Sequence, residues 1–210
     1  MNVSATYFQA MYERSPDPWS LATRWYDRRK YDLTVAALPK ARYRSAFEPG
    51  CSVGELSVRL AGRTDRLLSC DREPSAVASA AVRLSEAGYG HARAEQRIIP
   101  DEWPEESFDL IVLSEILYYF DEPTMQLIVK NALATLEPGG TLAAVHWRHP
   151  VPEHAQTGDT VHDALRAIPA LIPVCRHAEP DLLLDVFVHP GPGRAADSFQ
   201  GSVAAAEGLI

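Results

Sequence analysis

The chain has 210 residues, with 20 Lys and Arg against 28 Asp and Glu, and a formal net charge of −8 at pH 7. This length fits one domain with a substantial core. The acidic balance disfavours nucleic-acid binding, because affinity for phosphates depends on Lys and Arg. A local basic cluster is the exception, and it is either an anion contact or a solvated helix face. Its members are Arg24, Arg28, Arg29 and Lys30.

The three cysteines indicate neither a disulfide framework nor a structural metal. Cys51, Cys70 and Cys175 form no C-x-x-C pair and have no zinc-like spacing. No run of about 18 apolar residues occurs, and residues 1–15 lack the apolar core of a secretory signal. We therefore expect a cytoplasmic protein without a membrane segment and without a metal site.

Residues 1–40 predict a helical cap. Segments 4–14 and 19–38 carry apolar and aromatic side chains at helical spacing, and Pro16 and Pro18 separate them. Within the second segment, Trp25 and Tyr31 are expected to pack on the rest of the domain.

Strand-like and helical segments alternate after the cap. Strands are predicted near 44–48, 66–71, 91–96, 108–114 and 140–147, and helices near 53–61, 74–87 and 122–136. Such alternation predicts an α/β fold, a parallel sheet with helices on both faces. A helix over 157–168 and strands near 171–176 and 182–188 complete a single domain over residues 1–190. Residues 191–210, rich in Pro, Gly, Ala and Ser, are expected to form a flexible tail.

One loop carries the strongest functional signal. Phe47-Glu48-Pro49-Gly50-Cys51-Ser52-Val53-Gly54 follows the first strand, and Asp71 closes the second strand. Glycines at a strand-to-helix turn let backbone approach a ligand, and a carboxylate after the next strand accepts hydrogen bonds from ribose hydroxyls. The pattern predicts a nucleoside-containing cofactor. Ser52, where a dinucleotide fingerprint has glycine, argues against a pyrophosphate-bearing one.

Several ordered blocks resemble the class I S-adenosylmethionine-dependent methyltransferases. These blocks are Glu48 to Gly54 with Asp71, Trp103 to Tyr119, and Leu136 to Leu142. The chain is most similar to the NodS-like branch, over roughly residues 4–189, through the further motifs Asp17-Pro18-Trp19, Trp25-Tyr26, Arg29-Lys30-Tyr31 and His146-Trp147-Arg148-His149-Pro150.

The resemblance implies a Rossmann-like, doubly wound, seven-stranded and mostly parallel sheet whose last strand is antiparallel. It also implies S-adenosyl-L-methionine as the cofactor and N-methylation of a small acceptor, such as an amino sugar or amino-oligosaccharide.

The cofactor residues are expected along the strand ends. Glu48, Gly50, Ser52, Gly54 and Asp71 are the primary candidates, the alternative being a tight turn with Asp71 capping the next helix. Further candidates are Glu95 and Gln96 for the adenine, Ser114 for the donor, and Arg29 or Lys30 for the methionine carboxylate. Glu95 and Gln96 are otherwise ordinary surface polar residues.

Catalytic candidates follow the fourth and fifth strands. Glu115 is placed to orient an amine or take its proton, or else it caps a helix or is a structural hydrogen-bond acceptor. His146 is either a general base or a histidine satisfied by backbone hydrogen bonds. Tyr119, in the aromatic run Tyr118-Tyr119-Phe120, presents a ring that would favour a sulfonium. Tyr7, Trp19 and Tyr26 resemble a lid over this site.

Three other functions compete with N-methylation. O-methylation of a natural product would use the same donor pocket. A nicotinamide-dependent oxidoreductase is disfavoured by Ser52 and by the lack of a Tyr-x-x-x-Lys-type pair, and a noncatalytic ligand-binding protein is the third alternative. The expected partner is a small-molecule acceptor rather than nucleic acid or membrane, and the expected assembly is a monomer or weak homodimer.

Overall fold

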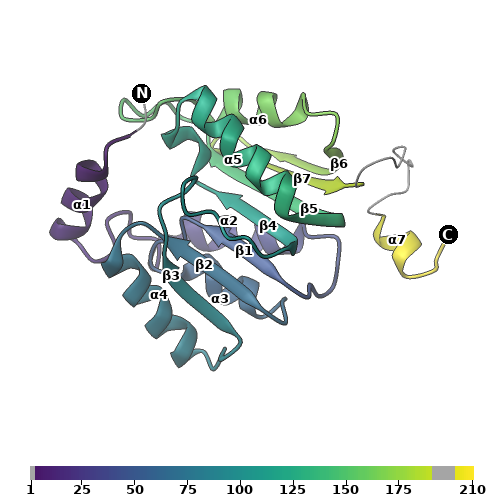
Figure 1. Cartoon of the computed structure of the whole chain (residues 1–210), viewed down its shortest axis with the longest axis horizontal. Coiled ribbons are helices and arrows are strands. Elements are labelled where there is room, and N and C mark those ends of the chain that lie inside the picture. Colours follow the sequence, from purple (N-terminus) through teal and green to yellow (C-terminus); the bar gives the residue numbers. More distant parts are fainter. Residues whose placement is uncertain (1–2, 191–201) are drawn as a thin grey trace.

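The computed structural model describes residues 3–190 and 202–210 and shows one seven-stranded sheet with helices on both faces (Figure 1). The strands are β1 (Ala46–Pro49), β2 (Leu67–Asp71), β3 (Ala92–Gln96), β4 (Phe108–Ser114), β5 (Leu136–Trp147), β6 (Ile172–Ala178) and β7 (Leu182–His189). The helices are α1 (Ala5–Arg14), α2 (Trp25–Ala36), α3 (Glu55–Ala61), α4 (Pro74–Glu86), α5 (Glu122–Thr135), α6 (Gly158–Arg166) and α7 (Val203–Ala206), with a 3-10 turn η1 (Leu117–Tyr119).

The strand order β3-β2-β1-β4-β5-β7-β6 confirms the predicted doubly wound α/β fold. Strands β1 to β5 are parallel, and β7 runs antiparallel to both β5 and β6. β5 begins at Leu136, earlier than the predicted residue 140, because Leu136 already pairs with Phe108 of β4.

Two hydrophobic cores lie on opposite faces of the sheet. Along β4, Ile111 and Leu113 face the core that includes α5 and α6, whereas Leu110 and Val112 face the core that includes α2, α3 and α4. All four side chains are fully buried. This alternation follows from the two-residue period of a strand and explains why residues 110–113 of the central strand are all apolar.

The cap differs from its predicted form. Its second helix begins at Trp25 rather than near residue 19, because the Asp17 carboxylate accepts the backbone N–H groups of Leu21 (2.9 Å) and Ala22 (3.0 Å) in a turn. In the same turn Ser20 adopts a φ of 56°. Tyr31 packs into the core as expected, but the expectation for Trp25 was wrong, since it is 72% exposed.

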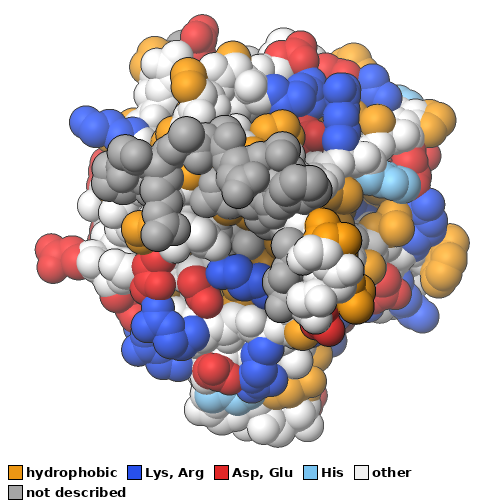
Figure 2. Space-filling model, turned by 90° about the vertical axis from the view of Figure 1, so that its right-hand side faces the viewer, with side chains coloured by type: hydrophobic (Ala, Val, Ile, Leu, Met, Phe, Trp, Pro, Cys, Tyr) orange, Lys and Arg blue, Asp and Glu red, His pale blue; other side chains and the backbone are white. Residues whose placement is uncertain are grey.

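The remaining surface includes the carboxy-terminal part of the chain. Residues 191–201 of the predicted tail lie outside the described residues, and residues 203–206 form the short helix α7, on the side of the molecule away from α1 (Figure 1). Basic and acidic side chains are interspersed on the face that carries α7 (Figure 2). No helix within residues 3–190 and 202–210 has the length and apolarity to cross a membrane.

Gly54 and Glu48 lie at the β1–α3 junction, where the chain packs closely against α4 and β2. Gly54 precedes α3 with φ +82°, and a Cβ there would lie 2.8 Å from the Cα of Ala80 in α4.

Glu48, 2% exposed, accepts hydrogen bonds from the hydroxyls of Ser57 (2.5 Å) and Ser69 (2.7 Å). Burial raises the pKa of Glu48 from 4.5 to about 7, although both hydroxyls act in the opposite direction.

Replacing Gly54 by Ala is expected to lower the free energy of unfolding by about 2 kcal/mol or more, because it adds a backbone clash with α4 to the cost of a positive φ. Gly88→Ala is the matched control, since Gly88 has φ +79° with nothing within 4 Å of a built Cβ. Urea unfolding of both variants measures the difference. Equal losses would contradict a role for Gly54 in α3–α4 packing.

Glu48 is expected to make folding stability pH-dependent. Because its pKa is higher in the folded than in the unfolded chain, its contribution is complete below about pH 4.5 and is lost as pH rises through about 7. Glu48→Gln, which keeps an acceptor for both serines, should gain about 3 kcal/mol relative to the wild type between pH 5 and pH 8. Unfolding curves at both pH values test this, and a constant difference would contradict it.

Candidate active site

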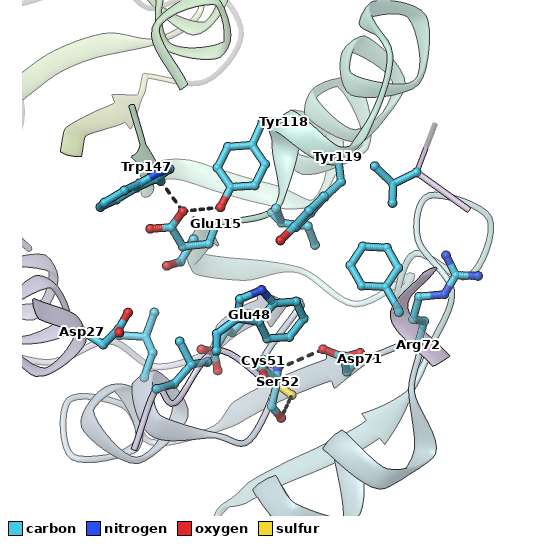
Figure 3. Close-up of a pocket in the computed structure, with 18 of the residues that line it drawn as sticks. Asp27, Glu48, Cys51, Ser52, Asp71, Arg72, Glu115, Tyr118, Tyr119 and Trp147 are labelled. Carbon is cyan, nitrogen blue, oxygen red and sulfur yellow. Dashed lines mark hydrogen bonds between the residues drawn. The ribbon is translucent and has the colours of Figure 1, made fainter. Parts of the chain in front are cut away.

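A cavity of about 630 Å³ opens where β1, β2, β4 and β5 end, between the sheet and the cap (Figure 3). In open α/β sheets this is where ligands bind. From the cap, aromatic side chains of α1, of the following turn and of α2 line the cavity. They are Tyr7, Phe8, Tyr12, Trp19, Tyr26 and Tyr31.

At one end of the cavity the β1–α3 loop meets the end of β2. Gly50 and Ser52 both have positive φ, 77° and 48°. The Asp71 carboxylate accepts the backbone N–H of Ser52 (2.9 Å) and of Glu73 (3.0 Å) (Figure 3). Burial raises the pKa of Asp71, and these backbone donors limit the rise. Four predicted cofactor residues, Glu48, Gly50, Ser52 and Asp71, therefore line the same cavity.

Ser52 also links this loop to the cap. Its hydroxyl lies 2.5 Å from the hydroxyl of Tyr12, and both residues are only 9% exposed. Val53, next to Ser52, packs with Tyr12 in a small apolar cluster. A glycine in place of Ser52 would have no side chain to make this contact with α1.

Four other predicted cofactor residues do not line the cavity. Glu95 is held by Arg93 (2.7 Å) and Arg97 (2.8 Å), and the Gln96 amide donates to the carbonyl of Arg72. Gly54 packs against α4, as described above. These three positions correct the prediction, because they direct their groups to neighbouring protein atoms instead of the cavity.

Arg29 is the fourth. Its guanidinium makes a two-pronged pair with Glu179, at 2.7 and 2.5 Å, at the turn between β6 and β7. It is therefore not placed to bind a methionine carboxylate. Lys30, the other candidate, lines the cavity, and its ammonium pairs with Asp27 and Glu115.

At the other end of the cavity, Lys30 of α2 forms a buried ion-pair cluster with Asp27 and Glu115. The Lys30 ammonium lies 2.9 Å from a carboxylate oxygen of each, and its side chain is 3% exposed. Burial acts to lower the pKa of Lys30, but Glu115 and Asp27 outweigh burial and raise it above its ordinary value. Lys30 is thus a charged group that ties the cap to the end of β4.

Glu115 is held from the other side as well. Its Oε2 accepts from the Tyr118 hydroxyl and from the backbone N–H of Trp147 (3.0 Å), while Oε1 accepts from Lys30 (Figure 3). Its φ of 55° turns the chain at the end of β4. The side chain remains 20% exposed and lines the cavity together with Ser114 and Tyr119, as predicted.

The prediction of His146 as a general base is wrong. His146 is fully buried and does not line the cavity. Its Nε2 accepts the backbone N–H of Leu117 (3.2 Å), and its Nδ1 lies 3.0 Å from Nε2 of His162, whose Nδ1 lies 2.8 Å from Asp185. Burial and His162 hold the pKa of His146 well below its usual value. The alternative of backbone hydrogen bonds holds for Nε2, whereas Nδ1 has a side-chain partner in His162.

This buried chain of side chains supports the turn that carries Tyr118 and Tyr119. A backbone N–H only donates, so Nε2 of neutral His146 accepts and its Nδ1 carries the proton toward His162. The chain runs from β7 through α6 and β5 to η1, and fixes the start of η1 at Leu117. His146 is thus a positioning residue.

Sequence reasoning missed several cavity residues. They are Asp27, Arg72, Arg97, Ile98, Ile99, His154 and Asp181. Asp27 had a usable signal, because it stands three residues before Lys30 on the same helix face. The others lie at strand ends or in connecting loops, where periodicity carries no information. Among residues 3–190 and 202–210, no group of three or more His, Cys, Asp or Glu is arranged to hold a metal ion.

Solved structures show the same architecture. A putative methyltransferase from Pseudomonas syringae is 44% identical, with a TM-score of 0.69, over 79% of this chain and 100% of that one. N-methyltransferase NodS from Bradyrhizobium japonicum WM9, in complex with S-adenosyl-L-homocysteine, is 28% identical, with a TM-score of 0.78, over 88% of this chain and 98% of that one.

The sequence comparisons agree with this. Nodulation protein S of Rhizobium tropici is 32% identical over 128 residues, 60% of this chain and about half (53%) of that relative. Nodulation protein S of Bradyrhizobium diazoefficiens is 29% identical over 194 residues, 88% of this chain and 91% of that relative. The family model for nodulation protein S (NodS) matches residues 11–161, well over half of the chain. The chain therefore belongs to the nodulation protein S family.

Proposed function

We propose that this protein transfers a methyl group from S-adenosyl-L-methionine to the nitrogen of a small amine acceptor. The observation that carries the proposal is the NodS neighbour with bound S-adenosyl-L-homocysteine, the demethylated donor, which matches 88% of this chain. The family membership and the cavity over the glycine loop support it.

The residues at the β1–α3 end of the cavity fit this donor. Gly50 lets the Ile116 side chain, which also lines the cavity, lie against the loop, because a Cβ would lie 2.7 Å from Cδ1 of Ile116. Asp71 presents a carboxylate suited to ribose hydroxyls, and Glu48 is at the base of the same loop. The volume of about 630 Å³ is in the range that small-molecule and cofactor sites occupy. When bound, the donor supplies an electrophilic methyl group on a sulfonium.

The Glu115 end of the cavity fits the acceptor. Glu115 presents its remaining acceptor capacity to an amine and offsets positive charge as the nitrogen becomes an ammonium. Ser114 precedes it, and the ring of Tyr119 adds an electron-rich face that favours cationic groups. Holding amine and methyl in line lowers the barrier without covalent participation of the protein. The aromatic cap excludes water from this arrangement.

For the acceptor we favour an amino sugar or amino-oligosaccharide. The relatives are nodulation proteins S. The rings of Tyr26 and Trp147, whose centroids are 5.1 Å apart, form an aromatic wall suited to stacking on a sugar ring. We also propose a cytoplasmic location and a monomer or weak homodimer, with no nucleic-acid or membrane partner, supported by the net charge of −8.

An isotope-labelled methyl assay tests the function directly. The panel contains glucosamine, a fully deacetylated glucosamine tetramer, a simple primary amine and a phenol. Label transfer to the amines but not to the phenol is the expected result. Transfer to the phenol alone would replace the proposal by O-methylation, and no transfer to any of them would overturn it.

Asp71→Ala is expected to weaken S-adenosyl-L-methionine binding at least tenfold, equivalent to about 1.4 kcal/mol, because it removes the carboxylate for the ribose. Calorimetric titration with the donor measures this. Asp65→Ala is a matched control, since Asp65 is exposed and pairs with Arg42 outside the cavity. Unchanged donor affinity of Asp71→Ala would contradict the ribose assignment.

Glu115→Gln is expected to reduce kcat about 100-fold while changing the donor Kd less than threefold, because the neutral amide no longer offsets charge on the acceptor nitrogen. Turnover with the glucosamine tetramer and donor calorimetry give the two values. Glu137→Gln, at the start of β5 outside the cavity, serves as control. Equal losses in turnover and donor binding would move Glu115 from the acceptor to the cofactor.

A further inference from the structure

We propose that His154 is the general base that removes a proton from the acceptor ammonium. The role rests on the proposed N-methylation, and it replaces the one that the sequence suggested for His146. Four observations support it: the position of the ring, its fixed orientation, its free nitrogens and the engagement of Glu115 and His146 by other groups.

His154 lies in the segment between β5 and α6, where the cavity meets a second one. It lines the main cavity together with Glu115 and Tyr119. It also lines an adjoining, more open cavity of about 440 Å³, which shares Val151 with the first. A proton taken up on the acceptor side can therefore leave toward solvent on the other side.

The orientation of the imidazole is fixed by η1. The ring stacks on Tyr118, with centroids 3.9 Å apart and an angle of 14° between the planes, and meets Tyr119 edge-on at 4.8 Å. The backbone is held too, because the N–H groups of Ala155 (2.9 Å) and Gln156 (3.1 Å) donate to the carbonyl of Tyr118. A general base needs such support, because its nitrogen must stay oriented toward the proton that it removes.

The nitrogens of this ring are available. All seven histidines of the chain lie in the part that the structure describes, and His154 is the one whose ring nitrogens make no hydrogen bond to another described residue. The other six, each with a hydrogen-bonded ring nitrogen, are His91, His146, His149, His162, His177 and His189.

The competing bases are occupied. Three of the roughly four acceptor positions of Glu115 are filled by Lys30, Tyr118 and the backbone of Trp147. His146 is fully buried outside the cavity. Glu115 therefore orients the amine, and the proton goes to His154.

The protonation state suits the role. Burial lowers the pKa of His154 below 6.5, against the opposing effect of Glu115 and Glu153, so the imidazole is neutral at pH 7 and accepts a proton. Titratable groups face it from η1, the ends of β4 and β5, α5 and its own loop. They are Tyr118, Tyr119, Glu115, His146, Glu122 and Glu153.

The acceptor enters as R–NH3⁺, and one N–H proton moves to an imidazole nitrogen, which leaves R–NH2 and an imidazolium. The nitrogen lone pair then attacks the methyl carbon as the carbon–sulfur bond breaks, with its electron pair remaining on sulfur. The products are the thioether and R–NH2–CH3⁺, and the imidazolium returns its proton to solvent.

Two substitutions separate proton transfer from ring packing. His154→Phe keeps a ring to stack on Tyr118 but has no nitrogen, and His154→Ala leaves space for added imidazole. With the glucosamine tetramer at pH 7, both are expected to lose at least 100-fold in kcat/KM with donor affinity unchanged by calorimetry. Imidazole should restore activity to the Ala variant and not to the Phe variant. His91→Phe, whose ring contacts Tyr89 and the carbonyl of Ala61 outside the cavity, should retain activity.

The pH profile gives an independent readout. In the wild type, kcat/KM should level off above the pKa of His154, whereas in His154→Phe it should rise about tenfold per pH unit up to the pKa of the amine. An active wild type with an equally active His154→Phe, or with an Ala variant that imidazole does not rescue, would overturn the role of His154 alone. A wild type that methylates none of the panel would overturn the proposed function and this role with it.

Discussion

The buried ion pair between Lys30 and Glu115 is the interaction on which the site depends. An ammonium that is 3% exposed must be paired, because an unpaired buried charge costs several kcal/mol. Its partners are Asp27 on the same helix and Glu115 at the end of β4. Moving α2 away from the sheet would therefore leave the charges of Lys30 and Glu115 without each other as partners. For this reason α2 is a part of the site.

A second contact fixes the cap at the opposite end of the cavity. The Tyr12 hydroxyl of α1 is hydrogen-bonded to Ser52 in the β1–α3 loop. Thus α1 contacts this loop, whereas α2 contacts Glu115 through Lys30. Between them, the aromatic side chains of the cap cover the cavity. Both ends of the cavity are thus covered by one amino-terminal segment that is held to the sheet by two polar contacts, an ion pair and a hydrogen bond.

The acceptor end shows how internal hydrogen bonding assigns roles. Most hydrogen-bond acceptor positions of Glu115 are filled by protein groups. Both ring nitrogens of His146 are hydrogen-bonded in the chain that supports η1, so neither side chain is free to take up a proton readily. The ring of His154 is held by stacking on Tyr118, and its nitrogens make no hydrogen bond to another described residue. Polar residues of similar chemistry at one rim therefore differ in what they can do because their neighbours differ.

The sequence by itself determined the fold class and the donor loop. Alternating apolar periods, the glycines around Ser52 and the spacing to Asp71 are local features, and local backbone chemistry dictates them. Tertiary structure decided which polar side chains face the cavity. Glu95 and Arg29 pair with charged side chains, the Gln96 amide donates to a backbone carbonyl, and His146 faces the interior. These orientations depend on partners 16 to 150 residues away in several cases, as with His162 and Glu179, and no local pattern contains that information.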